Sequence, residues 1–353
     1  MSKILGKHIP STPKNLLING DMRIAQRGTS FAAIADNTYT LDRFLYRKTG
    51  AMVHTISQDT DVPSLAQAGY LFQNSIRLNL TTPDTSIAVG DYTAIHQKME
   101  GYNFATIAQK PFTLSFWVKA PVSGIYCVAF TNSGNDRSYV AEYTVNGINT
   151  WEYKSVVVSA SPSAGTWNYT NGEGLRIQWT IACGSTFQTT ANAWQTGNFF
   201  ATSNQVNGVN TGATDFRIVG AMLNEGTLAL PFQLSGTTIA DELAVCQRYY
   251  EKSYDLTVNP ATITTVGVDG IVTARTGTNA WAKSFYKVKK RIVPTTVTLY
   301  SPDTGASANA RNDSAGTDVA TTVSNSGQSG FTITNAVGDQ IPLRWHWISD
   351  AEL

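Results

Sequence analysis

The sequence predicts an all-β protein with two domains and one helix, and three observations support this. Residues 112–121 alternate apolar and polar side chains, as a strand does when one of its faces covers a core. Similar runs recur along the chain, separated by short segments rich in glycine and asparagine, which favours antiparallel pairing. Only residues 238–253 form a good helix candidate, with apolar residues at helical spacing.

The central strand of the first domain is expected at residues 112–119. Leu114, Phe116 and Val118 point to one face, while Ser115 and Trp117 point to the other. Pro121 ends the strand, and a Ser-Gly turn follows. By the same criteria, further strands are expected at residues 44–47, 75–80, 125–130, 139–145, 151–158, 175–182 and 216–223.

Residues 238–253 are expected to form a helix that Thr238 caps, with Asp241 completing an approximate capping box. Its apolar stripe consists of Ile239, Leu243, Cys246 and Tyr250. The helix covers either an open edge of the first domain or a neighbouring subunit. A linker follows at 254–262. The second domain is expected to have strands at 267–274, 281–288, 295–300, 330–335 and 343–348, with long loops or short strands between 301 and 330.

The composition excludes several classes of protein. Charged residues make up 14% of the 353 residues and the net charge is +1, which does not support capture of nucleic acid or of an anionic membrane. No apolar run reaches the roughly 20 residues that span a bilayer. The N-terminus lacks the apolar core of a signal peptide, so we expect assembly in a cytoplasm, with release by lysis.

A search for catalytic groups predicts that the protein is not an enzyme. The nucleophile-elbow, zinc-protease and phosphate-loop motifs are absent. The neighbouring carboxylates Asp59 and Asp61 are interpreted as solvated. His96 is interpreted as a solvated or core-edge residue, and the three cysteines as buried thiols. No cofactor or metal site is predicted. A structural calcium ion would suit a fold of this kind, but no dense acidic loop marks a site for it.

Several segments, in this order, resemble a known family: NLLINGDMRIAQRG (15–28), YTLDRF (39–44), TLSFWVKA (113–120), FRIVGAMLNEG (216–226), PFQ (231–233), ELAVCQRYYEKSY (242–254) and SDAEL (349–353). Together they are similar to phage and prophage tail fiber-type proteins that carry a jelly-roll domain like a carbohydrate-binding module. The resemblance implies a jelly-roll β-sandwich over 15–253 that includes the helix, and a smaller β-sandwich-like domain over 263–353. It also implies that residues 1–14 are an arm that attaches the protein to the virion.

The function implied by this resemblance is that of a virion fiber, a homotrimer that binds host polysaccharide or lipopolysaccharide without cleaving it. Two alternatives stay open. One is a structural head-fiber, decoration or adaptor protein that binds another virion protein. The other is a virion enzyme that cleaves glycans, since its two carboxylates could be distant in sequence.

Aromatic residues outside the alternating core pattern are the candidates for stacking on a sugar ring. They lie in polar loops, beside side chains that can bind hydroxyl groups, or they plug the ends of the jelly roll. The candidate glycan-binding residues are Trp167, Tyr169, Asn171, Trp194 and Gln195. If the arm is the anchor, the second domain is distal, and its tip is a rival site with Trp281, Tyr300, Trp345 and Trp347.

Overall fold

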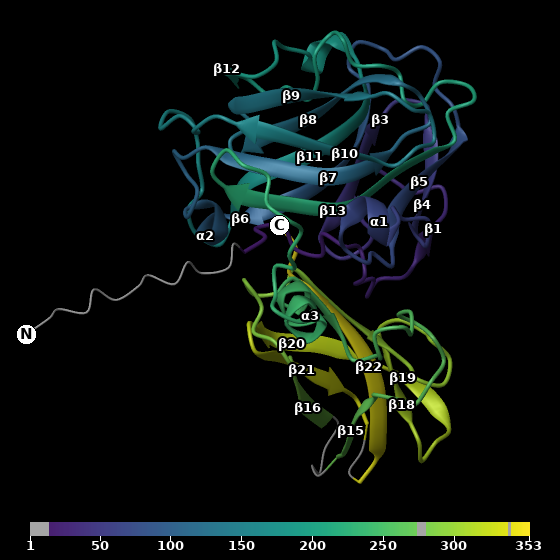
Figure 1. Cartoon of the computed structure of the whole chain (residues 1–353). Coiled ribbons are helices and arrows are strands. Elements are labelled where there is room, and N and C mark those ends of the chain that lie inside the picture. The colour runs from purple at the N-terminus through teal and green to yellow at the C-terminus, as the bar shows by residue number, and fades with distance from the viewer. Residues whose placement is uncertain (1–13, 274–279, 338–339) are drawn as a thin grey trace, which may run out of the picture.

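The computed structural model describes residues 14–273, 280–337 and 340–353, and the predicted arm at 1–14 lies outside this part except for Lys14. Figure 1 shows two β bodies, one above the other, with the C-terminus at their junction. The all-β fold class is confirmed. Every strand expected from alternation is present, with its ends shifted by a few residues.

The first body is a sandwich of two antiparallel sheets, here called sheet A and sheet B (Figure 1). Sheet A has the order β1 (Ser30–Phe31), β4 (Val53–Asp59), β5 (Ser75–Thr82), β13 (Asp215–Glu225), β7 (Phe112–Lys119) and β10 (Glu152–Val158). Sheet B has the order β12 (Trp194–Thr196), β9 (Arg137–Val145), β8 (Gly124–Asn132), β11 (Glu173–Cys183), β6 (Tyr92–Glu100), β3 (Phe44–Thr49) and β2 (Thr38–Tyr39).

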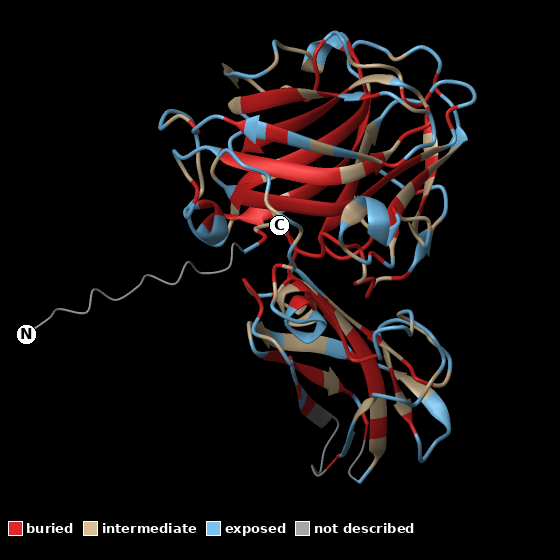
Figure 2. Cartoon of the chain, in the orientation of Figure 1, coloured by how far each residue is buried: buried red, intermediate tan, exposed pale blue. Residues whose placement is uncertain are grey.

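The core of the sandwich lies between the two sheets, where the buried strands cross the body in Figure 2. Strand β7 contributes Phe112, Leu114, Phe116 and Val118, all fully buried. The apolar phase of the alternation therefore faces inward as expected, and each such side chain contributes about 1.5–3 kcal/mol by leaving water.

The outer faces of the two sheets differ in how they are covered. The segment between β11 and β13, which contains a short 3-10 helix at Ser185–Phe187, folds back over sheet B. Phe200 packs there on Tyr92, and Gln205 accepts a hydrogen bond from the backbone of Cys127 at 2.7 Å. On sheet A, the outer face forms the floor of an open groove that is described below.

The second body has strands that pair around β22 (Pro342–Asp350), and a three-stranded sheet. The strands around β22 are β14 (Tyr250–Lys252), β15 (Asp269–Val272), β17 (Thr296–Tyr300), β18 (Asn309–Asn312) and, paired with β18, β19 (Thr317–Ala320). The other sheet has the order β16 (Ala280–Phe285), β21 (Gly330–Asn335) and β20 (Thr322–Gly327). The stretch at 301–330 therefore forms short strands.

Helix α3 (Ile239–Gln247) is shorter than the predicted helix at 238–253. Thr238 and Asp241 form the expected capping box. After the helix the chain becomes strand β14, which pairs with Ile348–Asp350 of β22. The predicted apolar stripe of the helix therefore ends before Tyr250. The backbone of Tyr250 is instead paired with β22, near the end of the chain. Two further short helices, α1 (Leu65–Ala68) and α2 (Gly101–Phe104), were not predicted.

Helix α3 lies at the junction of the two bodies (Figure 1). Its Cys246, together with the following Tyr249, packs against Ile18 and Ile24 of the first body. This answers the question that the sequence left open, because the partner of the helix belongs to the same chain.

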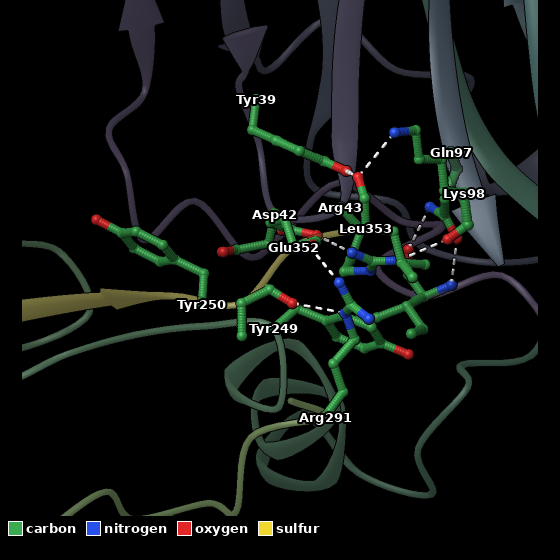
Figure 3. A network of polar contacts seen from close by, with 12 residues as sticks. Tyr39, Asp42, Arg43, Gln97, Lys98, Tyr249, Tyr250, Arg291, Glu352 and Leu353 are labelled. Atoms are coloured by element: carbon green, nitrogen blue, oxygen red, sulfur yellow. Dashed lines mark hydrogen bonds and ion pairs between the residues drawn. The ribbon is translucent and has the colours of Figure 1, made fainter. Parts of the chain in front are cut away.

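Three arginines hold the end of the chain at this junction: two are buried, Arg43 and Arg291, which Figure 3 shows, and the third is partly buried. Arg43 forms an ion pair with Glu352 and lies 3.6 Å above the ring of Tyr249. Arg291 donates to the main-chain oxygens of Ala351 (2.6 Å) and Glu352.

Arg27 is the third of these arginines. It lies 3.8 Å above the ring of Tyr250 and pairs with Asp350 at 3.1 Å and with Glu352 at 3.2 Å. The ion pairs and the ring contacts connect the two bodies within one buried network, in which each guanidinium has several partners.

We predict that Arg43→Ala lowers the free energy of unfolding by about 3–5 kcal/mol, because it removes one of the two guanidinium partners of the buried Glu352 carboxylate together with the contact on the Tyr249 ring. Urea denaturation of the whole chain measures this. Arg47→Ala is the matched control, since Arg47 pairs with Asp36 at a partly exposed position and should cost less than about 1 kcal/mol. Equal losses in the two variants would contradict a special role for the junction.

The buried histidine His54 predicts a loss of stability in acid. Burial, with a smaller contribution from the charge of Lys48, lowers the pKa of His54 to about 4, and its ring lies 2.7 Å from the Tyr46 hydroxyl. Between pH 6.5 and 4 the unfolded chain takes up a proton that the folded chain does not. The free energy of unfolding therefore falls by about 3 kcal/mol as the pH is lowered from 6.5 to 4. Below pH 4, His54 causes no further loss.

We expect a His54→Gln variant to lack this part of the pH dependence, whatever its stability at neutral pH. Urea denaturation at several values between pH 7 and pH 4 measures both slopes. If the variant and the natural protein lost the same free energy over that range, His54 would not be the titrating group.

Candidate functional site

An open groove of about 770 Å³ lies on the outer face of sheet A. Its floor consists of Ser115 and Trp117 from β7, Tyr153 from β10 and Gly220 from β13. Its two walls are residues 67–72, which include the end of α1, and residues 229–233, which follow β13. The groove therefore joins a flat sheet face to two raised loops.

The two rings on the floor face solvent because of strand phase and register. Trp117 lies in the polar phase of β7, opposite to the core residues. Tyr153 is its direct cross-strand partner on β10, and the ring centroids are 5.5 Å apart at an interplanar angle of 55°. Tyr153 is 45% exposed and Trp117 is partly exposed. Together they form an apolar platform that water can reach.

Three more rings build the walls. Tyr70, Phe72 and Phe232 contact one another with centroids 4.7–5.2 Å apart. Gly220 makes this possible, since it has a positive φ of 66° at an irregularity of β13, and a Cβ there would lie 2.6 Å from the ring of Phe72. Any other residue at this position would displace the wall.

A strip of paired charges lies on sheet A and at its edge. Three carboxylates and three cations alternate there: Asp215 with Arg77 (2.7 Å) and Arg217 (3.3 Å), Asp59 with Arg217 (3.1 Å), and Asp61 with Lys119 (2.7 Å). Burial raises the pKa of Asp61, but hydrogen bonds from Lys119 and Trp151 outweigh it and hold the pKa below its usual value. Asp61 is therefore a poor proton donor at neutral pH.

The aromatic residues chosen from the sequence gather at an end of the sandwich, away from this groove. Phe104 stacks on Trp167 at 5.1 Å and on Tyr169 at 6.0 Å, and Trp194 meets Trp167 edge to face at 5.6 Å. The indole nitrogens of Trp167 and Trp194 donate to the main-chain oxygens of Ala164 and Ser159. Both tryptophans pack against the core, and Tyr169 remains 40% exposed.

Of the polar candidates near these rings, Gln195 has a side-chain partner, whereas Asn171 is exposed and bonded only through its main chain. Gln195 donates to Thr190 at 3.0 Å, and the main-chain oxygen of Asn171 accepts from Arg291. The structure thus brings the predicted rings together, but as packing that includes core residues.

The rival site in the second body is not a surface cluster. Trp345 and Trp347 are buried, with indole nitrogens that donate to Ser284 (3.1 Å) and Asp269 (2.8 Å). Neither ring is available to a ligand, which corrects that part of the prediction. Tyr300 is partly exposed and meets Tyr254 edge to face, while the side chain of Trp281 lies outside the described part of the chain.

The other candidate groups are also placed. His96 is 1% exposed on β6, with no hydrogen-bond partner on either ring nitrogen among the described residues, so it is not solvated. The three cysteines are buried and free, as expected. In the described ranges, no group of three histidine, cysteine, aspartate or glutamate side chains is arranged to hold a metal ion. No helix in these ranges is both long and apolar enough to cross a bilayer.

The sequence carries a signal for the groove in the positions of two aromatic residues within their strands. Trp117 is a large ring in the polar phase of a strand, and Tyr153 occupies the same phase of β10. One such ring needs no explanation, but two that meet on neighbouring strands form an exposed apolar patch, which is a sign of a binding face. The wall rings carry no such signal, since their approach depends on loops distant in sequence.

Comparison with known proteins finds similar solved structures but no matching family model or curated protein. Solved structures similar to residues of this chain include a family 4 carbohydrate-binding module (12% identity, TM-score 0.30, 59% of this chain and 98% of the other). A family 61 module in complex with β-1,4-galactotriose is also similar, with 8% identity and a TM-score of 0.30 over 60% of this chain and 99% of the other. So is a CBM22 xylan-binding domain from Paenibacillus barcinonensis, with 10% identity and a TM-score of 0.25 over 62% of this chain and 99% of the other. With TM-scores this low, these similarities carry no argument about the ligand.

Proposed function

We propose that the protein binds a glycan in the groove on sheet A and does not cleave it. The observation that supports this best is the solvent-facing pair of Trp117 and Tyr153 on the groove floor. A pyranose ring presents an apolar C–H face to such a platform, and its hydroxyl groups need hydrogen-bond donors and acceptors at the sides.

The groove supplies those polar groups. Gln67 and Gln233 lie in opposite walls and Ser115 in the floor. Gln67 uses its amide oxygen in the cap of α1, Ser115 is buried, and no contact within the described residues occupies the exposed side chain of Gln233. The amide nitrogen of Gln67 and the amide group of Gln233 can therefore bind hydroxyl groups without first losing a partner in the protein.

The absence of catalysis is part of the proposal, and the pairing of the carboxylates near the groove supports it. A glycosidase needs one carboxyl group with a raised pKa as proton donor and a second as base or nucleophile. Here Asp59, Asp61 and Asp215 are all paired with cations, and the pKa of Asp61 is lowered.

The place of this binding is proposed from the sequence resemblance to phage tail proteins. We propose that the protein acts as a receptor-binding fiber on a virion, as a homotrimer attached through its N-terminal arm. Such an arrangement suits weak sites, since a glycan contact with a Kd near 1 mM is worth about −4 kcal/mol, and linking several copies raises avidity by ~10²–10⁴.

We predict that Tyr153→Ala weakens glycan binding by about 10–100-fold, because loss of one buried ring costs about 1.5–3 kcal/mol. A glycan array, followed by calorimetric titration of the glycan that binds best, measures this. Tyr169→Ala is the matched control: that ring has similar exposure but lies in the end cluster, and its loss should leave Kd unchanged within about twofold. The opposite ranking of the two variants would move the site to the end cluster.

A second candidate is a structural protein that binds another virion protein through the same groove. Exposed leucines near the groove favour it: Leu65 and Leu71 are 55% and 67% exposed, and Leu228 is 74% exposed. A properly assembled protein that binds no glycan on the array, but loses its place on the particle when Leu71 and Leu228 become serine, would support this candidate. Release of reducing ends from host polysaccharide would instead show an enzyme.

A further inference from the structure

A second hollow of about 580 Å³ adjoins the groove on the side of helix α3. Tyr70 and Gln233 line both hollows, so the two lie side by side and share these two side chains. The remaining lining residues of the second hollow are Lys14, Leu234, Ser235, Gly236, Thr237, Asp241 and Val245. The two neighbouring hollows together reach from sheet A to the segment that joins the two bodies.

The lining of the second hollow suits a polar, uncharged ligand with apolar faces. Tyr70 presents a partly exposed ring, and Leu234 and Val245 add apolar surface. Thr237 and Gln233 are exposed, and no contact within the described residues occupies their side chains. The charges of Lys14 and Asp241 are opposite in sign and leave little net preference for an anion or a cation.

The loop that forms this hollow is held in place before any ligand arrives. The buried carboxylate of Glu242 accepts hydrogen bonds from the backbone of Gly236 (2.7 Å) and from the hydroxyl of Ser235 (2.9 Å). It also accepts one from the backbone of Asn19 at 2.5 Å. A ligand that contacts residues 233–237 therefore spends little free energy on ordering them.

We infer that the two hollows bind one linear glycan along several of its sugar units, with the second hollow as a separate subsite. Each hollow alone falls in the size range of about 300–1,000 Å³ that holds one small ligand, and the two are neighbours that share the side chains of Tyr70 and Gln233. A terminal sugar would fill only the floor with Trp117 and Tyr153. This inference rests on the proposed function and adds the form of the ligand to it.

The test uses the full-length protein and ladders of one to six sugar units. The probes are β-1,4-linked gluco-, galacto- and xylo-oligosaccharides, together with a ladder prepared from whichever linear glycan binds on the array. Titration gives Kd for each length with the natural protein, Tyr153→Ala and the double variant Leu234→Ala/Thr237→Ala, whose two side chains line the second hollow but not the groove. Val89→Ala serves as a control for the loss of an exposed apolar side chain elsewhere on the first body.

With the natural protein we expect Kd to fall at least tenfold between the shortest length that binds and the hexasaccharide. The double variant should bind the short oligosaccharide within twofold of the natural value and lose most of this gain, whereas Tyr153→Ala should weaken both. Hydrogen exchange of residues 233–245 should slow with the hexasaccharide and remain unchanged with the short one.

Kd values that do not change with length, or a double variant with the full gain, would overturn the inference and leave the proposed function standing. If no array glycan and no ladder binds, the proposed function fails and the inference fails with it.

Discussion

The structure depends on the way three arginines hold the last residues of the chain between the two bodies. Arg27, Arg43 and Arg291 are buried or nearly so, and each lies against a main-chain oxygen, a carboxylate or an aromatic ring of the opposing segment. A buried guanidinium without such partners would cost several kcal/mol. Because Asp350 and Glu352 come from the end of the chain, the junction is complete only when the second body has folded.

This junction explains much of the sequence resemblance without reference to a ligand. Arg27, Arg43, Tyr249 and Glu352 come from four of the segments that carry the resemblance, and all four meet here. Those segments therefore identify a scaffold in which the two bodies are joined in a fixed way. Three other segments, which contain Trp117, Gly220 and Phe232, reach the groove. The groove is thus built on a framework whose most distinctive residues serve packing.

A structural feature could be predicted from the sequence when residues close to it in the chain determine it, and could not when distant residues do. Strand β7 was predicted well, because alternation between Leu114 and Trp117 is local. The end of helix α3 was not predicted correctly, because Tyr250 pairs with a residue of β22 that lies about a hundred residues further along the chain. The candidate rings Trp167 and Trp194 were chosen because they lie in polar loops, yet a polar loop can fold its rings back onto the core. The position of Tyr153 beside Trp117 follows from the register of β10 on β7, which the sequence does not state.

The same reasoning explains why one face of the sandwich is the better place for a ligand. Both sheets have outer faces, but the segment after β11 covers part of sheet B with Phe187 and Phe200. The hydrogen bond between Gln205 and the backbone of Cys127 holds this segment on the sheet. A ligand at that part of sheet B would have to displace packed rings. On sheet A, the walls lie beside Trp117 and Tyr153 and leave them open to solvent. Covering part of one sheet and framing the other leaves the two floor rings of the proposed glycan groove open, and the neighbouring hollow reaches the helix that joins the two bodies.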